Sequence, residues 1–171
     1  RRVLFRSSRE SESITRLFAD DPFGQSLLLA MRLIEHGIRF VTVNSEISWD
    51  THSDNFSSLK TKLLPPFDAG ITALEQALSA KGLLERTLVF AGGEFGRTPT
   101  INKGAGRDHW PRASWALFTG GGIKPGQLIG GTDAKGHGPD DATQIKPDDF
   151  AATICRALGI DHRPEYQTRQ G

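Results

Sequence analysis

Hydrophobic and polar positions in the first half of the chain alternate between a helical and a strand-like pattern. Residues 23–37 place apolar side chains at helical spacing on one face, and Gly37 is a typical helix stop. Residues 38–44 are rich in β-branched and aromatic side chains, which predicts a buried strand. The stretch 59–82 is helical in its second half and ends at Gly82.

The second half of the chain adds two short strands and one helix to this pattern. Residues 87–93 and 114–122 are short apolar runs that predict strands. Between them lies 94–112, the longest stretch without apolar periodicity. Residues 146–160 have the pattern of an amphipathic helix. The alternating order of elements indicates the α/β fold class.

The order strand, helix, strand suggests where a functional site would lie. It predicts a βαβ unit, so we expect 38–44 and 87–91 to be parallel neighbours in one sheet. Ligand sites in such sheets lie beyond the carboxyl ends of the strands. At those ends the chain carries the polar loops 45–56 and 92–110. Irregular loops longer than about 12–15 residues are uncommon in compact domains unless they serve a site.

The contents of the two loops suit a divalent metal ion. Six side chains offer carboxylate oxygens or imidazole nitrogens: Asp50, His52, Asp54, Glu94, Asp108 and His109. These donors favour zinc, with Ca²⁺ or Mg²⁺ as alternatives. A catalytic zinc site takes about three protein ligands and keeps one position open. A single loop carboxylate is usually solvated or caps a turn, so the convergence of several donors indicates the site.

Two arginines in the second loop allow two interpretations. Arg97 and Arg107 could clamp a phosphate or sulfate oxyanion, or they could pair with Glu94 or Asp108 and fix the loop. The residues alone favour the ion pair. Nearby, the glycine-rich 120–127 lacks the spacing of a phosphate-binding loop, and turn formation explains it.

Composition narrows the classes of function. The net charge of +1, without a basic stripe, gives no electrostatic footprint of a nucleic-acid-binding protein. No apolar run approaches the ~18–20 residues that span a bilayer. The single cysteine, Cys155, excludes disulfides within the chain and cysteine-based zinc sites. Trp49 and Trp110 are interpreted as packing residues. The remaining histidines are expected to be structural or solvent-facing: His36, His137 and His162.

Five blocks of sequence, in the same order, carry a family resemblance. They are "LLLAMRLIEHGIRFVTVN", "WDTHSDNF", "GLLERTLVFAGGEFGRTPTINKGAGRDHWPRA", "GGGIKPGQLIGGTD" and "DFAATICRALGID". From about residue 18 to 161 the chain resembles the C-terminal part of the DUF1501 proteins, a bacterial family of unknown function. The resemblance implies an alkaline-phosphatase-like three-layer sandwich with a mainly parallel sheet. It also implies a missing N-terminal half of the same chain.

The resemblance divides the chain into three parts and implies export of the parent protein. Residues 1–13 have no apolar periodicity and are interpreted as a disordered fragment edge or reading-frame artefact. Residues 14–162 are the C-terminal part of the domain, and 163–171 are a tail. The family commonly carries a twin-arginine export signal, which implies a periplasmic or cell-surface location. Arg1 and Arg2 are not that signal, because no apolar segment follows them.

Single positions are also similar to the metal ligands of the alkaline phosphatase and sulfatase superfamily. Asp50, His52 and His109 resemble the ligands of one metal, although the family spacing is Asp-x-x-x-His and this chain has Asp-x-His. Glu94 takes the place of an aspartate that holds a second metal, and Phe95 takes the place of its histidine partner. Phenylalanine cannot bind a metal, so we expect one metal site rather than two. The nucleophile would lie in the missing half.

These features lead to a metal-dependent hydrolase of phosphate or sulfate esters, acting on a small molecule or a glycan. Arg97 or Arg107 would clamp the oxyanion. The 171 residues alone are expected to be inactive, because they lack the nucleophile. Two alternatives remain open at this stage. One is a non-catalytic exported protein that keeps the fold and one structural metal, which Phe95 favours. The other is a polar interaction surface without a metal.

Overall fold

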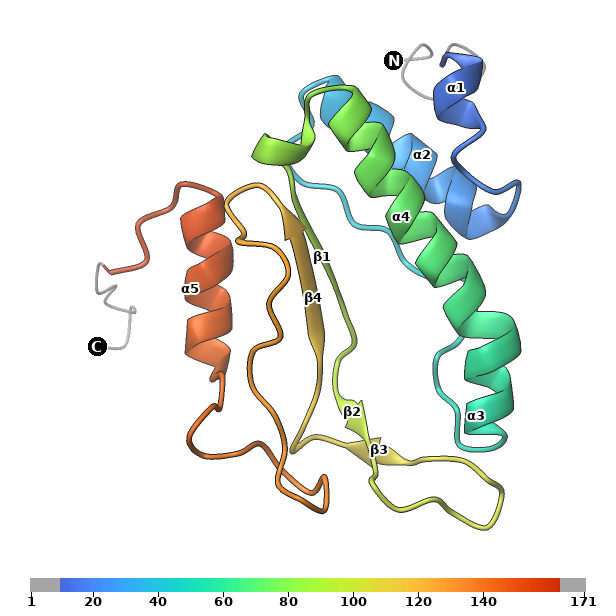
Figure 1. The fold of residues 1–171 in the computed structure, drawn as a ribbon, viewed down its shortest axis with the longest axis vertical. Coiled ribbons are helices and arrows are strands. Elements are labelled where there is room, and N and C mark those ends of the chain that lie inside the picture. Colours follow the sequence, from blue (N-terminus) through green and yellow to red (C-terminus); the bar gives the residue numbers. More distant parts are fainter. Residues whose placement is uncertain (1–9, 164–171) are drawn as a thin grey trace, which may run out of the picture.

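The computed structural model describes residues 10–163 (Figure 1). Most of the segment 1–13 and of the tail 163–171 therefore lies outside the described residues. The last residues of the first segment belong to the fold, because helix α1 (Glu12–Thr15) begins there. Glu10 lies next to two cations of the helical layer: its carboxylate is 3.4 Å from Arg32 Nε and 2.8 Å from Lys81 Nζ.

Two long helices form the helical layer and contain the core. Helix α2 (Pro22–Glu35) is capped by Asp21, whose side chain accepts hydrogen bonds from two backbone N–H groups of the first turn. Helix α4 (Leu64–Ala80) continues from α3 (Asn55–Ser58) and the π-helical turn η2 (Leu59–Leu63). Apolar side chains at helical spacing on α2 and α4 are fully buried against each other: Leu28, Met31, Ala77 and Leu78. Both helices agree with the predicted patterns.

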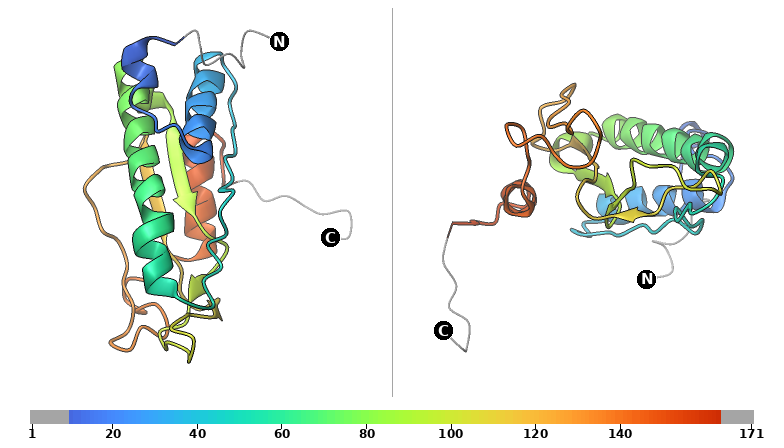
Figure 2. Two further views of the ribbon diagram at one scale, coloured as in Figure 1. Left: turned by 90° about the vertical axis from the view of Figure 1, so that its right-hand side faces the viewer. Right: turned by 90° about the horizontal axis from the view of Figure 1, so that it is seen from below.

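A two-stranded sheet lies between this helical layer and the last helix (Figures 1 and 2). After the 3-10 turn η3 (Leu84–Arg86), strand β1 (Leu88–Gly92) pairs antiparallel with β4 (Ala116–Gly120). On one face, Phe90 and Phe118 contact Phe150 of α5 (Pro147–Ala157), with ring centroids 5.2 and 5.5 Å from it. On the other face, the Thr119 hydroxyl donates to Glu75 of α4. Alternating side chains therefore hold one layer on each face of the sheet.

The predicted strand at 38–44 does not form in the described part of the chain. These residues run without regular secondary structure, and β1 pairs with β4 instead of with them. Val43 packs against the helical core, whereas Phe40 is 74% exposed. A strand forms only where a neighbouring strand offers hydrogen-bond partners for its backbone N–H and C=O groups. The side chains of 38–44 favour a strand but do not determine whether such a neighbour is present. The expected parallel pairing of 38–44 with 87–91 is therefore absent, and the mainly parallel sandwich remains a prediction.

The long stretch between β1 and β4 contains a small hairpin that the sequence pattern did not predict. Strand β2 (Gly96–Arg97) pairs antiparallel with β3 (His109–Trp110), and Arg97 lies opposite His109. A side chain at Gly96 would lie 1.9 Å from the carbonyl oxygen of Ala113, so only glycine fits there. The hairpin places His109 beside the loop that follows α2. Among the described helices, none is long and apolar enough to cross a membrane.

Candidate metal centre

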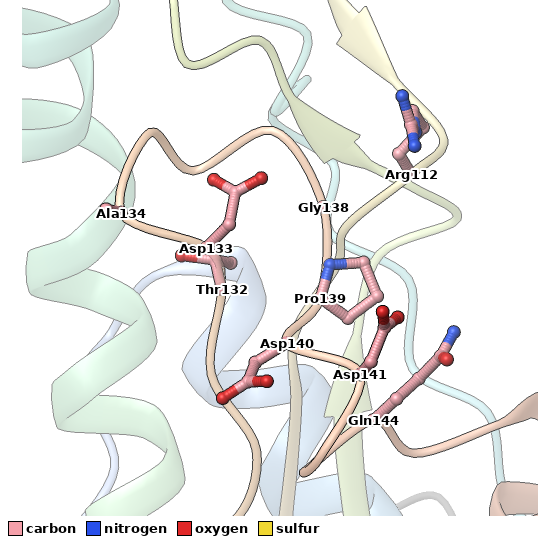
Figure 3. Close-up of a pocket in the computed structure, with 9 residues that line it drawn as sticks. All are labelled: Arg112, Thr132, Asp133, Ala134, Gly138, Pro139, Asp140, Asp141 and Gln144. Carbon is pink, nitrogen blue, oxygen red and sulfur yellow. The ribbon is translucent and has the colours of Figure 1, made fainter.

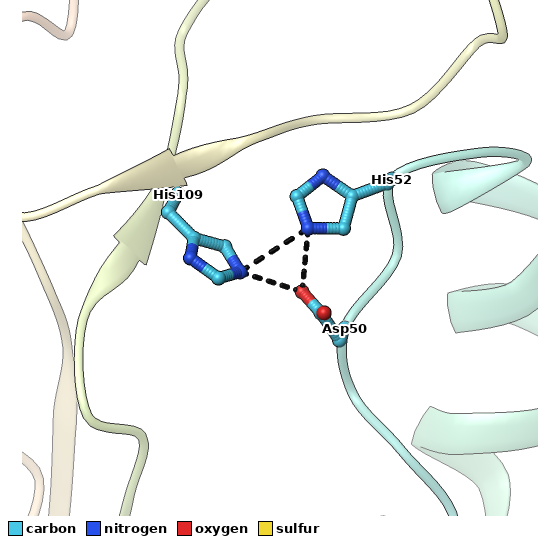
Figure 4. A group of neighbouring side chains, drawn as sticks. All are labelled: Asp50, His52 and His109. Atoms are coloured by element: carbon cyan, nitrogen blue, oxygen red, sulfur yellow. Dashed lines mark hydrogen bonds and ion pairs between the residues drawn. The ribbon is translucent and has the colours of Figure 1, made fainter.

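Three side chains from two distant loops converge on one point (Figure 4). Asp50 Oδ1 lies 2.8 Å from His109 Nε2 and 3.0 Å from His52 Nε2. The two Nε2 atoms are 3.2 Å apart. Ligand atoms about 2.0–2.1 Å from a tetrahedral zinc ion lie about 3.3–3.4 Å from one another. If the distances between the three atoms increased by a few tenths of an ångström, the atoms would fit around one zinc ion. The fourth coordination position would then be open.

Backbone hydrogen bonds dock the two loops on each other and so bring the three side chains together. Arg107 N donates to Thr51 O at 3.1 Å, and two similar bonds join 54–55 to 104–105 at 3.0 Å. Below this contact, the buried Thr51 hydroxyl donates to Asn55 Oδ1 at 2.5 Å. Gly106 lies directly on the backbone of His52, where a side chain would have no room. The position of His52 relative to His109 is therefore fixed by main chain rather than by flexible side chains.

Asp108 supports His52 from the side opposite the cluster. Its Oδ1 lies 2.7 Å from His52 Nδ1, while His52 Nε2 faces Asp50 and His109. Hydrogen bonds from His52 and from Asn102 hold the pKa of the Asp108 carboxyl below its ordinary value. A carboxylate that accepts from the outer nitrogen of a metal-binding histidine orients the ring and leaves the inner nitrogen free as a ligand. The sequence pattern had offered Asp108 as a metal donor or as an ion-pair partner of Arg97 or Arg107.

The donor atoms of the cluster favour a cation between them. The carboxylate of Asp108 requires a hydrogen on His52 Nδ1, so a neutral His52 presents a lone pair at Nε2. That lone pair would face the carboxylate oxygen of Asp50 at 3.0 Å, and two acceptors at this distance repel. A hydrogen on His109 Nε2, which lies 2.8 Å from Asp50 Oδ1 and 3.2 Å from His52 Nε2, or a metal ion between the three atoms relieves this repulsion. The cluster is therefore suited to hold a cation.

Asp50 is the anionic member of the cluster. Hydrogen bonds from His109 and then from Arg97 lower the pKa of its carboxyl from the ordinary 3.8 to about 2. Arg97 Nη2 lies 2.5 Å from Asp50 Oδ1. The same guanidinium donates to the carbonyl oxygens of Trp49 and Arg107 at 3.2 and 3.3 Å. Arg97 thus forms an ion pair, as the residues alone favoured, but with Asp50 instead of Glu94 or Asp108.

We expect the Asp50 carboxyl of the metal-free protein to titrate near pH 2, and Arg97→Gln to move its pKa upward. Because the folded-state pKa is lower than the unfolded one, ionised Asp50 stabilises the fold above the unfolded pKa. That contribution is lost as the pH falls toward 2. Carboxyl ¹³C NMR of wild type and variant measures both values. An Asp50 pKa that does not change in Arg97→Gln would contradict this assignment.

Other sequence-predicted residues lie outside the cluster. Glu94 is exposed and, within residues 10–163, is not part of the group that Asp50, His52 and His109 form. Asp54 precedes α3 with a left-handed φ of 47°, without a side-chain cap. The guanidinium of Arg107 lies over the Phe56 ring, 5.3 Å from its centroid. The structure thus brings together three of the four proposed ligands.

The two tryptophans beside the cluster make packing contacts, as predicted. Trp49 packs edge-on against Phe67 with centroids 5.6 Å apart. Trp110 Nε1 donates to the carbonyl oxygen of His137 at 2.9 Å. The ring of Phe95 packs against His109 with centroids 4.3 Å apart, so it supports this ligand. Sequence reasoning missed Asn102, which contacts both His52 and Asp108; its only signal was an asparagine shortly before two loop glycines.

A shallow hollow lies among the turns that follow β4 (Figure 3). Arg112, Gln144 and three carboxylates line it, those of Asp133, Asp140 and Asp141. Backbone N–H groups of His137 and Lys135 donate to the Asp133 side chain and lower the pKa of its carboxyl. The Asp140 side chain accepts from Ala142 N in the same way. These two carboxylates hold turns, as aspartates in loops commonly do.

Fold and site together define a mixed helix-and-sheet protein with a candidate centre for one divalent metal ion. The chain belongs to the DUF1501 family: the model of that family, described as "Protein of unknown function (DUF1501)", matches residues 2–171. This confirms the family expected from the sequence blocks. Searches of curated proteins and of solved structures find no match to the chain. The relationship to alkaline phosphatases and sulfatases therefore remains a prediction.

Proposed function

We propose that the chain holds one divalent metal ion, zinc before Ca²⁺ or Mg²⁺, on Asp50, His52 and His109. The observation that carries the proposal is the convergence of two imidazole nitrogens and one carboxylate oxygen within 3.2 Å of one another. Two nitrogen donors favour zinc over the harder Ca²⁺ and Mg²⁺, which prefer oxygen ligands. Asp108 adds the outer carboxylate that such sites use to orient a histidine.

We further propose that this centre serves the hydrolysis of phosphate or sulfate esters, on a small molecule or a glycan. A bound metal would neutralise ester oxygens and lower the pKa of a nucleophile. Among the chain's own residues, Arg97 holds Asp50 in place and is engaged at three acceptors. Arg107 is the better candidate for an oxyanion, because its guanidinium has no anionic partner in the described residues and lies over Phe56.

The proposal predicts which protein is active. Full-length protein loaded with zinc should hydrolyse a generic aryl phosphate or aryl sulfate, and removal of the metal with a chelator should abolish turnover. The 171 residues alone should bind the metal without turnover, since the nucleophile is expected outside them. Elemental analysis after dialysis and release of the aryl alcohol measure the two properties. Metal-dependent turnover by the 171-residue protein would show that the nucleophile has been misplaced.

A second candidate function is a structural metal without catalysis. Phe95 favours it, because the resemblance implies a histidine ligand of a second metal at this position, and the Phe95 ring, which packs on His109, cannot bind a metal. Bound zinc without turnover of either ester by the full-length protein supports this candidate. If the protein takes up no divalent metal, both candidates are wrong, and an interaction surface without a metal is the better explanation of the polar loops.

A further inference from the structure

We infer that Asn102 is a positioning residue of the metal centre, acting on His52 through Asp108; this inference rests on the proposed function. The Asn102 Nδ2 group donates to His52 O at 2.9 Å. It also lies 3.3 and 3.4 Å from the two carboxylate oxygens of Asp108. One side-chain amide therefore contacts the backbone of a proposed ligand and the carboxylate that orients the ring of the same ligand.

The other end of the amide organises the loop that carries Asp108. Asn102 Oδ1 accepts hydrogen bonds from Gly104 N at 2.9 Å and from Gly106 N at 3.0 Å. The backbone closes the same turn, since Asn102 N donates to Gly106 O at 2.9 Å. A side-chain amide offers two donor hydrogens, toward His52 and Asp108, and a separate acceptor oxygen for the loop N–H groups, whereas a hydroxyl has a single donor hydrogen. This explains an asparagine at a position where many polar residues could form a turn.

The consequence for the centre follows from the direction of the contacts. Asp108 Oδ1 must stay in line with His52 Nδ1, at 2.7 Å, for the ring to present Nε2 to the metal. Asn102 fixes the carboxylate from one side and the His52 backbone from the other, so it restricts both ends of that hydrogen bond. Without it, the carboxylate and the ring can turn independently, and the ligand is less well prepared for binding.

The test is the zinc affinity of the purified full-length protein in a double-mutant cycle. Asn102→Ala should weaken zinc binding about 10-fold, the effect of losing an outer partner of a metal ligand. Asp108→Ala should weaken it by at least as much. If Asn102 acts in part through Asp108, the loss of affinity in the double variant should be smaller than the sum of the two single losses, because coupled residues are not additive. Asn44→Ala is the matched control, since Asn44 is exposed and lies outside this network.

A merely structural role gives a different pattern. If Asn102 only closes the turn, its loss and that of Asp108 should add in the double variant, and this outcome overturns the inference. Asn102→Ser separates the roles if the alanine variant does not fold, because a serine hydroxyl can cap the turn but is too short to reach His52 O. Zinc affinity in Asn102→Ser equal to wild type also overturns it. Absence of zinc binding by the wild type overturns the proposed function itself.

Discussion

Replacing His109 with alanine is expected to lower the affinity for zinc by roughly 10-fold or more. A lost ligand should cost at least as much as a lost outer partner, for which about 10–100-fold is typical. His109 Nε2 lies within 3.2 Å of both other ligand atoms, so its removal opens one side of the cluster and leaves two donors. Zinc competition with a chromophoric chelator measures the affinity of the purified full-length protein.

His137→Ala is the matched control for this measurement. His137 lies beside the same hairpin, and its backbone carbonyl, rather than its ring, accepts the hydrogen bond from Trp110. Its ring is outside the group formed by Asp50, His52 and His109. The variant should therefore bind zinc as the wild type does. Equal affinities in the His109 and His137 variants would identify His109 as a structural loop histidine.

Local patterns in the sequence were sufficient to predict the helices and strands that place apolar side chains against another layer. The helices at 23–37 and in the second half of 59–82, the strands at 87–93 and 114–122 and the last helix all form. The central apolar side chains of these patterns, such as Leu28, Leu78 and Phe150, contact the core or a neighbouring layer. Leu158 and Ile160, at the end of the last pattern, are about half exposed. Helices satisfy their own backbone, and β1 and β4 satisfy each other across one ladder.

Pairing between distant segments could not be predicted in the same way. The run at 38–44 has the side chains of a strand, but its ladder depends on a neighbour that no local pattern specifies. The hairpin of β2 and β3 is the reverse case, because it forms without a strand-like sequence pattern. Each of its strands has only two residues, which is too short for an alternating pattern to be recognised. Backbone contacts, which carry no side-chain signature, decide both cases.

The candidate site was predictable as a set of residue types and not as a geometry. Asp50, His52 and His109 were selected because loops at one sheet edge carry metal-binding donors, and the structure brings these three together. The reason differs from the expected one, since the loops meet through the hairpin and through backbone bonds between 51–55 and 104–107 rather than through parallel strands. Glu94 was selected by the same edge argument and remains apart, because β1 has no parallel neighbour in the described residues.

The docking of the two loops makes Gly106 a sterically sensitive position beside the site. A Cβ atom at Gly106 would lie 1.9 Å from His52 O, 2.1 Å from His52 C and 2.5 Å from Ser53 N. All three are backbone atoms, which cannot turn away as a side chain can. Gly106→Ala must therefore push the two loops apart and break the hydrogen bond from Arg107 N to Thr51 O.

We expect Gly106→Ala to weaken zinc binding by at least 10-fold, because it displaces His52, one of the proposed ligands. Overpacking of this kind also lowers the free energy of unfolding by about 1–3 kcal/mol. Gly104→Ala is the control two residues away: its Cβ would meet Asn102 Oδ1 at 3.4 Å and Ser53 Cβ at 3.6 Å, which are ordinary contacts. It should keep wild-type zinc affinity, and its stability should be unchanged or slightly higher, because alanine restricts the unfolded chain.

Zinc titration and urea unfolding of the two alanine variants separate the possible outcomes. Loss of affinity in Gly106→Ala alone shows that the backbone contact between the loops holds His52 against His109. If Gly106→Ala binds zinc as tightly as Gly104→Ala, the two loops do not need to touch for the centre to form. The three side chains would then assemble around the ion by their own flexibility, and the backbone docking would serve only the stability of the fold.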